Sequence, residues 1–415
     1  MIEIKVLGAG QEVGRSAFLV DTGVEKFLLD YGLNGQNFAV PIQPPPGLDG
    51  VFISHAHLDH CGMVPELYRR GYAKNIFGTQ TTLELSNLLL HDSLGIQARR
   101  GIEPLYLNSD LQKAKHNSKA LGFNQPVEFS KSKVELRDAG HIPGSSSILV
   151  DAGTKRLLYT GDLKYLETKL MRPADTNFKD IDALVIESTY SYANHPDRNE
   201  LAEDLLVNIK RVLDNNGTVL LPSFAIGRTQ EMLLILQDLN VPIYLDGMGI
   251  DATQIVLNNP GSIKDPEKLK KAFGKARKVE GPADRQNALK ESCVVIASAG
   301  MLQGGPMHYY VKKLYKKENC MLVFNGYQVE GTTGRSVLEK HRFIENGNSV
   351  DVKMEIQFMD FSAHIGKDNL FKFIGQVNPS KVIAVHGGKI DDFVKELKQK
   401  GFDASGPKNG DIIKV

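Results

Sequence analysis

The run Ser54-His55-Ala56-His57-Leu58-Asp59-His60 constrains this chain more than any other feature. It places three histidines and one aspartate within six positions, from 55 to 60. Imidazole nitrogens and a carboxylate oxygen are ligands typical of zinc. His55 and His57 are two residues apart, so on an extended backbone both side chains point to the same side. Because the apolar stretch 50–53 is typical of a buried strand, we expect a metal site where this strand ends.

The overall charge of the chain does not indicate any class of partner. The 415 residues carry 50 Lys+Arg against 49 Asp+Glu, so an enzyme acting on nucleic acid would need local basic patches. The 3 cysteines are an odd number, which fits a reducing compartment. The N-terminus has a strand pattern, and no apolar run approaches the ~20 residues that span a bilayer. We therefore expect a cytoplasmic protein with no membrane partner, and the sequence leaves its oligomeric state open, a homodimer included.

Polar side chains stand at the ends of several other apolar strands. These residues are His141, Asp162, Glu187, His364 and His386. Asp30 also ends a strand, where it can brace a metal ligand. A buried strand that ends in glutamate is unusual unless the carboxylate has a partner. Neighbouring strands that each place such a residue at one edge would build a shared site.

Two other features of the first part of the chain have non-functional interpretations. The stretch 8–14 superficially matches a dinucleotide-binding fingerprint, but strands are expected on both sides of it, whereas the fingerprint needs a following helix. Residues 79–122 have helical spacing. His91 and His116 lie in that segment, and we interpret them as surface or packing residues.

From about Asn194 the pattern changes to a longer alternation of strands and helices, which is typical of a doubly wound parallel sheet. Glycine-rich stretches at 298–306 and 326–335 follow two of its strands. Glycine, hydroxyls and arginine near helix starts suit phosphate groups, although tight turns need glycine in any case. The candidate substrate contacts are Arg228, Ser298, Gly300, Thr332 and Arg335.

The strand pattern then returns to that of the first part. We expect residues 1–192 and 356–415 to form one domain in two parts, with residues 193–355 inserted between them. In this arrangement the strand 356–364 ends in His364 and the strand 381–386 ends in His386.

At this point the sequence resembles a known family. The run 55–60, with His141 and Asp162, resembles the metallo-β-lactamase fold. The strand ends at Glu187, His364 and His386 resemble the further motifs of its β-CASP nuclease branch. The stretches 54–62 and 326–332 most resemble the cleavage and polyadenylation specificity factor nucleases, above all their archaeal relatives. The resemblance implies an α/β protein, an αββα sandwich with an inserted β-CASP α/β domain.

The resemblance also implies roles for single residues. The first zinc would be held by His55, His57 and His141. The second zinc would be held by Asp59, His60 and His386, with Asp162 bridging both. His364 would be the general acid, Glu187 would orient it, and Asp59 would complete the catalytic group. Asp30 would support the first metal's ligands. The family often has glycine after Ser-Thr-Tyr, whereas this chain has Ser191, so the loop after Glu187 is expected to differ.

The implied function is hydrolysis of single-stranded RNA. Two Zn²⁺ ions, with Mn²⁺ as the alternative, would generate a hydroxide that attacks phosphorus. The products would be a 5′-phosphate and a 3′-hydroxyl, in RNA 3′-end processing or decay. Endonuclease and 5′–3′ exonuclease action both remain open at this stage. The competing interpretations are a small-molecule thioesterase or lactonase, which would need no inserted domain, and a non-catalytic scaffold subunit, which would not need every ligand position filled.

Overall fold

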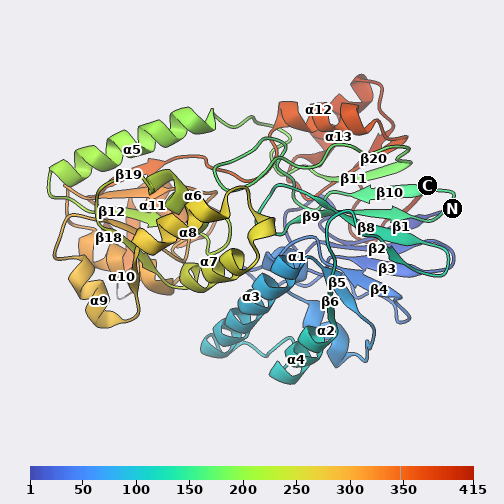
Figure 1. Cartoon of the computed structure of the whole chain (residues 1–415), viewed down its shortest axis with the longest axis horizontal. Coiled ribbons are helices and arrows are strands. Elements are labelled where there is room, and N and C mark those ends of the chain that lie inside the picture. The colour runs from blue at the N-terminus through green and yellow to red at the C-terminus, as the bar shows by residue number, and fades with distance from the viewer. Residues whose placement is uncertain (346) are drawn as a thin grey trace. The chain divides into compact units, whose positions relative to one another are not determined.

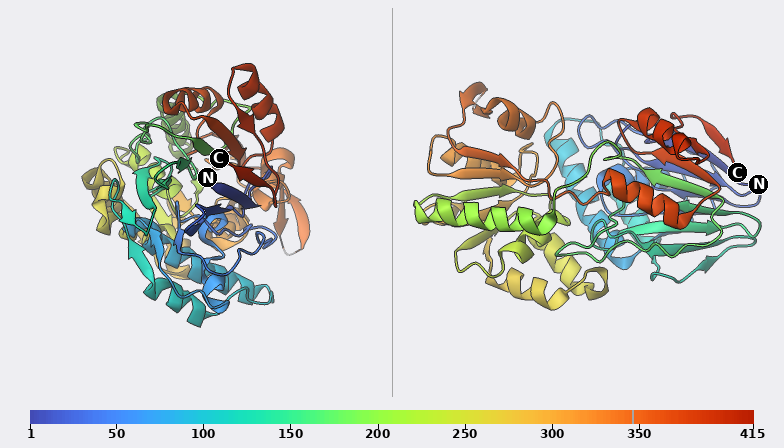
Figure 2. Two further views of the ribbon diagram at one scale, coloured as in Figure 1. Left: turned by 90° about the vertical axis from the view of Figure 1, so that its right-hand side faces the viewer. Right: turned by 90° about the horizontal axis from the view of Figure 1, so that it is seen from above.

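The computed structural model describes residues 1–345 and 347–415 and folds them into two compact units. Unit 1 contains Met1–Glu167, Arg172–Asn194 and His364–Val415. Unit 2 contains Thr168–Met171 and His195–Ala363. Strand β22 pairs with β1, so the two chain ends lie side by side in unit 1 (Figures 1 and 2). No helix in the described ranges is long and apolar enough to cross a membrane.

Unit 1 contains two mixed sheets. The first has, in spatial order, β22 (Ile412–Lys414), β1 (Glu3–Gly8), β2 (Ala17–Asp21), β3 (Lys26–Leu29), β4 (Gly50–Phe52), β5 (Ile76–Gly78) and β6 (Ser118–Ala120). The second has β21 (Ala404–Ser405), β20 (Lys381–Val385), β11 (Ala183–Glu187), β10 (Arg156–Tyr159), β9 (Ser146–Asp151), β8 (Lys133–Asp138) and β7 (Val127–Glu128). The helices of this unit are α1 (Leu58–Cys61), α2 (Val64–Arg69), α3 (Gln80–Arg99), α4 (Asn108–His116), α12 (Lys367–Val377) and α13 (Ile390–Gln399).

The two sheets of unit 1 face each other across a shared apolar core. Phe18 and Phe27 from the first sheet pack in this core with Val185 from β11. The neighbours of Val185 on β11, Leu184 and Ile186, instead join a core with α12 and α13 (Figure 1). A strand buried on both faces reads as a continuous apolar run, as β11 does. The first sheet packs in the same way against α2 and α4, which completes an αββα sandwich.

Unit 2 is built on a parallel sheet. Its spatial order is β14 (Arg277–Val279), β13 (Ile243–Asp246), β15 (Val294–Ala297), β12 (Val219–Pro222), β16 (Met321–Phe324) and β19 (Glu355–Phe358). Strands β17 (Arg342–Glu345) and β18 (Asn348–Asp351) form a separate two-stranded antiparallel sheet. The helices are α5 (Arg198–Asp214), α6 (Arg228–Leu236), α7 (Gly249–Asn258), α8 (Pro266–Lys275), α9 (Pro282–Ala288), α10 (Gly305–Leu314) and α11 (Thr333–Lys340), with a 3₁₀ turn at Pro260–Ser262. From β12 the chain first moves to β13 and β14, and it then returns through β15 to β16 on the other side of β12. Such a reversal is typical of doubly wound sheets.

Two expectations about single elements were wrong. Residues 79–122 form α3 and α4 with a break between them, and then β6, because Ser118–Ala120 pairs in parallel with β5. The strand expected at 356–364 ends at Phe358. It hydrogen-bonds with β16 in unit 2, so residues 356–363 lie with the inserted unit and His364 follows on a loop.

One buried ion pair in unit 2 joins all the segments by which the chain enters and leaves this unit. Arg198 Nε and Nη2 donate to the Glu231 carboxylate at 2.8 and 2.7 Å. Its Nη1 and Nη2 donate to the carbonyls of Ser362 and Phe361, both at 2.9 Å. The backbone N–H of Lys169 donates to Glu231 at 3.3 Å. Although burial raises the pKa of Glu231, the Arg198 guanidinium holds it below its ordinary value.

Replacing Glu231 with Gln leaves the Arg198 charge buried without its counter-ion. Breaking a buried pair costs about 3–5 kcal/mol of unfolding free energy. The matched control is Glu355→Gln, which breaks the more exposed bidentate pair with Arg211 and should cost about 1 kcal/mol or less. Urea unfolding followed by circular dichroism measures both, and hydrogen exchange assigns the loss to unit 2. Equal losses in the two variants would contradict this account.

Candidate metal centre

Four side chains from separate parts of unit 1 converge on one point. His55 follows β4, His57 precedes α1, His141 follows β8, and Asp162 follows β10. His57 Nδ1 lies 3.2 Å from His55 Nε2 and 3.3 Å from His141 Nε2. Asp162 Oδ2 lies 3.5 Å from His55 Nε2 and 3.6 Å from His141 Nε2. Ligands about 2.0–2.1 Å from a tetrahedral zinc stand about 3.3 Å apart, so these spacings suit one ion.

Backbone geometry brings two of these ligand-bearing loops together. Gly161, just before Asp162, has a φ of +56°, and a Cβ there would lie 2.7 Å from the Ser54 side chain. Only glycine combines this conformation with so close an approach. Beyond β8, the N–H of His141 donates to Ser145 Oγ at 3.0 Å, which holds the turn that presents its ring.

A second cluster contains Asp59, His60 and His386. Asp59 Oδ2 lies 3.9 Å from His60 Nε2 and 3.8 Å from His386 Nε2. Asp162 Oδ1 lies 3.3 Å from His60 Nε2. The carboxylate of Asp162 therefore directs one oxygen at each cluster, so the structure brings together all seven ligands expected from the sequence.

The donor set fits divalent cations. Asp162 Oδ1 is buried and lacks a hydrogen-bond partner, which is costly unless a cation satisfies it. Burial lowers the pKa of His55 well below its ordinary value and that of His57 to about 4, so both rings are neutral and offer a lone pair. Burial would also lower the pKa of His60, but the Asp162 and Asp30 carboxylates raise it well above its ordinary value. That surplus of negative charge favours a bound cation.

Asp30 supports this centre in a way that the sequence did not predict. We expected it to support the first cluster, but its direct contact is with the second: His60 Nδ1 lies 2.7 Å from Asp30 Oδ2. It also accepts from Ser54 N and Oγ and from the Tyr159 hydroxyl, each at 2.7 Å. Ser54 Oγ lies 3.0 Å from His55 Nδ1, so Asp30 reaches the first cluster through Ser54.

Three hydrogen-bonding partners were missed by sequence reasoning: Ser16, Ser54 and Tyr159. Ser16 Oγ lies 2.9 Å from His386 Nδ1. Serines and a tyrosine in or beside ordinary strands carry no local signal, because only the folded sandwich brings them to the ligands. Ser54 alone could have been suspected, since it directly precedes His55.

His364 and Glu187 form a pair beside the first cluster. His364 Nδ1 lies 3.0 and 3.1 Å from the two Glu187 oxygens and 3.9 Å from Asp162 Oδ2. Glu187 also accepts from the backbone N–H of Leu163 at 2.8 Å, which fixes the carboxylate. Burial lowers the pKa of His364, but the Glu187 and Asp162 carboxylates outweigh it and raise it to about 9. The arrangement presents a protonated imidazole that can donate a proton.

The candidate substrate contacts lie in unit 2, at or beyond the carboxyl ends of its strands. Gln328 Nε2 donates to the carbonyls of Gly300 and Gly326 at 3.1 and 2.9 Å, which joins the two glycine-rich loops. Thr332 caps α11 by accepting from the Arg335 N–H at 3.2 Å. Ser298 directly follows β15. Arg228 differs, because it is buried 3.7 Å from Glu231 and thus extends the ion pair described above.

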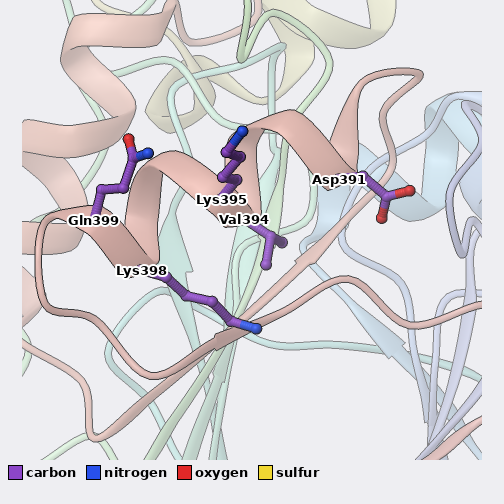
Figure 3. A pocket seen from close by; sticks show the side chains of 5 residues that line it. All are labelled: Asp391, Val394, Lys395, Lys398 and Gln399. Carbon is purple, nitrogen blue, oxygen red and sulfur yellow. The ribbon is translucent and has the colours of Figure 1, made fainter.

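A cavity of about 500 Å³ on unit 1 lies apart from these groups. It is lined by Asp391, Val394, Lys395, Lys398 and Gln399. Figure 3 shows that these side chains all come from α13. None of them belongs to either metal-ligand cluster. A surface formed by one helix does not enclose a ligand, so we assign no site to it.

Family models match the chain in three segments. A beta-lactamase superfamily domain matches residues 17–206, and a Beta-Casp domain matches residues 229–337. A Zn-dependent metallo-hydrolase RNA specificity domain matches residues 349–407. Probable RNase MJ4 of Methanocaldococcus jannaschii is 37% identical over 100% of both chains. The chain belongs to the β-CASP branch of the metallo-β-lactamase superfamily.

Other β-CASP relatives are similar over most of their length. RNase aCSPSF2 of Saccharolobus solfataricus is 38% identical over 99% of this chain and 85% of its own. Transcription termination factor FttA of M. jannaschii is 34% identical over 100% of this chain and 72% of its own. A crystal structure of an Enterococcus faecalis V583 protein of unknown function covers both chains fully, with a TM-score of 0.65 and 15% identity, and shares the fold.

Because Asp162 faces both clusters, we expect Asp162→Ala to lose bound metal. The matched control is His91→Ala, which removes an exposed histidine of α3 outside both clusters. Metal content is measured by mass spectrometry on protein purified without chelator. A wild-type metal content in Asp162→Ala would refute the shared role of this carboxylate.

Proposed function

We propose that this β-CASP protein is a metal-dependent ribonuclease that hydrolyses phosphodiester bonds of single-stranded RNA, in 3′-end processing or decay. The observation that carries the proposal is the buried Asp162 carboxylate, shared by two ligand clusters and 3.9 Å from the His364 ring. The names of two relatives, probable RNase MJ4 and RNase aCSPSF2, support RNA as the substrate.

We propose two zinc ions as the cofactors. His55, His57 and His141 would hold one, and Asp59, His60 and His386 the other, with Asp162 between them. When bound, such ions polarise the phosphate and make water a stronger nucleophile near neutral pH. Ligation mainly by imidazole favours zinc over manganese.

The protein's own part in the proposed reaction is to move a proton. Water gives up one proton to the surrounding solvent as its oxygen bonds to phosphorus. The bond from phosphorus to the 3′ oxygen breaks, and His364 donates a proton to that leaving oxygen. Glu187 holds Nδ1, so the proton is delivered from Nε2. The products are a 5′-phosphate and a 3′-hydroxyl.

Unit 2 would bind the RNA backbone. Ser298, Gly300, Thr332 and Arg335 belong to loops that end neighbouring parallel strands or open α11, where backbone N–H groups and a guanidinium suit phosphate oxygens. Arg228 is not included among these contacts, because it is buried in the ion pair with Glu231 within α6.

One assay separates this proposal from its alternatives. The protein is incubated in parallel with end-labelled single-stranded RNA and with a panel of thioesters and lactones. Hydrolysis of the small esters without RNA cleavage would indicate a small-molecule hydrolase, and no turnover by metal-loaded protein would indicate a scaffold. Substrates with 5′-monophosphate, 5′-triphosphate and blocked ends distinguish endonuclease from 5′–3′ exonuclease action.

We expect His364→Ala to retain metal while RNA cleavage falls about 10²- to 10⁴-fold, the usual contribution of a positioned acid. A phosphodiester with a p-nitrophenolate leaving group needs no protonation, so its hydrolysis should fall much less. Rates on both substrates are measured with the same enzyme preparation. An equal loss on both would contradict the proton-donor role, because it would point to a general defect of the centre.

A further inference from the structure

We propose that Tyr192 is a stacking platform for an RNA base near the cleaved bond, a site that deepens the proposed ribonuclease function and rests on it. Tyr192 is 47% exposed. It stacks on the ring of Tyr190, with centroids 6.1 Å apart and planes 20° apart. Tyr190 in turn lies 6.1 Å from the ring of His364. An exposed aromatic face is therefore connected through one buried ring to the proposed proton donor.

A cation completes this platform. Lys389 Nζ lies 4.9 Å from the centroid of the Tyr192 ring. Cation and ring attract each other, and a base that stacks on the ring would displace the flexible ammonium to its edge, where it can contact a phosphate of the same strand. Proteins that bind single strands use this combination of a π-face and a nearby positive charge, because every base has a face to stack.

Both members of the platform follow strands that deliver groups of the catalytic centre. Tyr192 comes five residues after Glu187, at the end of β11, and Lys389 comes three residues after His386, beyond β20. These strands are parallel neighbours, with Glu187 paired to Val385. Their carboxyl ends share one edge of the sheet, which places the platform beside the centre.

The loop that carries Tyr192 is held on both sides. The N–H of Ser188 donates to the His386 carbonyl at 3.2 Å, and a Cβ on Gly387 would lie 2.5 Å from Ser188 Oγ, so the two loops are closely packed. On the other side, Asn194 and Asp368 exchange two hydrogen bonds of 2.9 Å. An aromatic side chain on a fixed loop loses little entropy when it binds a base.

Single exposed aromatic residues are common on protein surfaces and need no function. Tyr192 differs because its ring stacks on Tyr190, which lies 6.1 Å from the ring of His364, and because Lys389 lies over its ring. A planar ring of this kind recognises an unstacked base in a sequence-tolerant manner, as expected for single-stranded RNA.

The test compares Tyr192→Ala with Tyr192→Phe on RNA oligonucleotides that carry one abasic nucleotide, stepped along both sides of the cleaved bond. Stacking contributes about 1–3 kcal/mol per base, so kcat/KM on intact RNA should fall roughly 5- to 150-fold in Tyr192→Ala. Tyr192→Phe keeps the ring and should stay close to wild type. Metal content and the unfolding midpoint establish that both variants are folded.

The abasic series distinguishes stacking from a structural role. At one position the missing base should slow the wild type by a similar factor and leave Tyr192→Ala with no further loss. Two results would overturn the platform. One is a kcat/KM of Tyr192→Ala that stays below that of the wild type by the same factor at every abasic position, and the other is no loss of kcat/KM in Tyr192→Ala on intact RNA. If the wild type cleaves no RNA, the proposed function fails separately. The platform is then judged by fluorescence anisotropy of the same oligonucleotides, where equal binding by wild type and Tyr192→Ala overturns it.

Discussion

The buried carboxylate of Asp162 is the interaction on which the rest of this structure depends. One oxygen faces the nitrogens of His55 and His141, and the other faces His60. A carboxylate removed from water is unstable unless cations or donors satisfy it, so the surrounding imidazoles and the ions they would hold are needed together. Together with the larger contribution of Glu187, the same charge raises the pKa of His364 against the effect of burial.

The residues that follow the strands hold the groups around Asp162 in place. Asp30 and His386 follow β3 and β20 with φ angles of +58° and +49°, a left-handed conformation that costs energy for residues with a side chain. Asp30 recovers this cost through four hydrogen bonds of 2.7 Å to Ser54, His60 and Tyr159. The apolar core behind these strands keeps the loops in place. The rigid sheets therefore fix the positions of the ligand side chains.

Sequence reasoning identified the ligands because they either belong to the run 55–60 or follow an apolar strand, and strand ends gather at one edge of a sheet. It did not identify Ser16 or Tyr159, which lie within or beside strands and have no local pattern. It also placed the strand before His364 in the wrong unit. Only two of the four residues of β19, Ile356 and Phe358, are apolar, so the sequence signal is weak, and the pairing of β19 with β16 places the strand in unit 2.

The sequence by itself determined the metal-binding chemistry, since residues 55–60 hold three imidazoles and a carboxylate at a spacing that no other use explains well. It also determined the layered α/β class, because apolar periodicity is local. The tertiary structure alone decided which ligand Asp30 orients, how Arg198 joins the connecting segments, and that Tyr190 lies against the ring of His364. Those contacts link residues far apart in the chain, and their geometry depends on packing that no short stretch of sequence encodes.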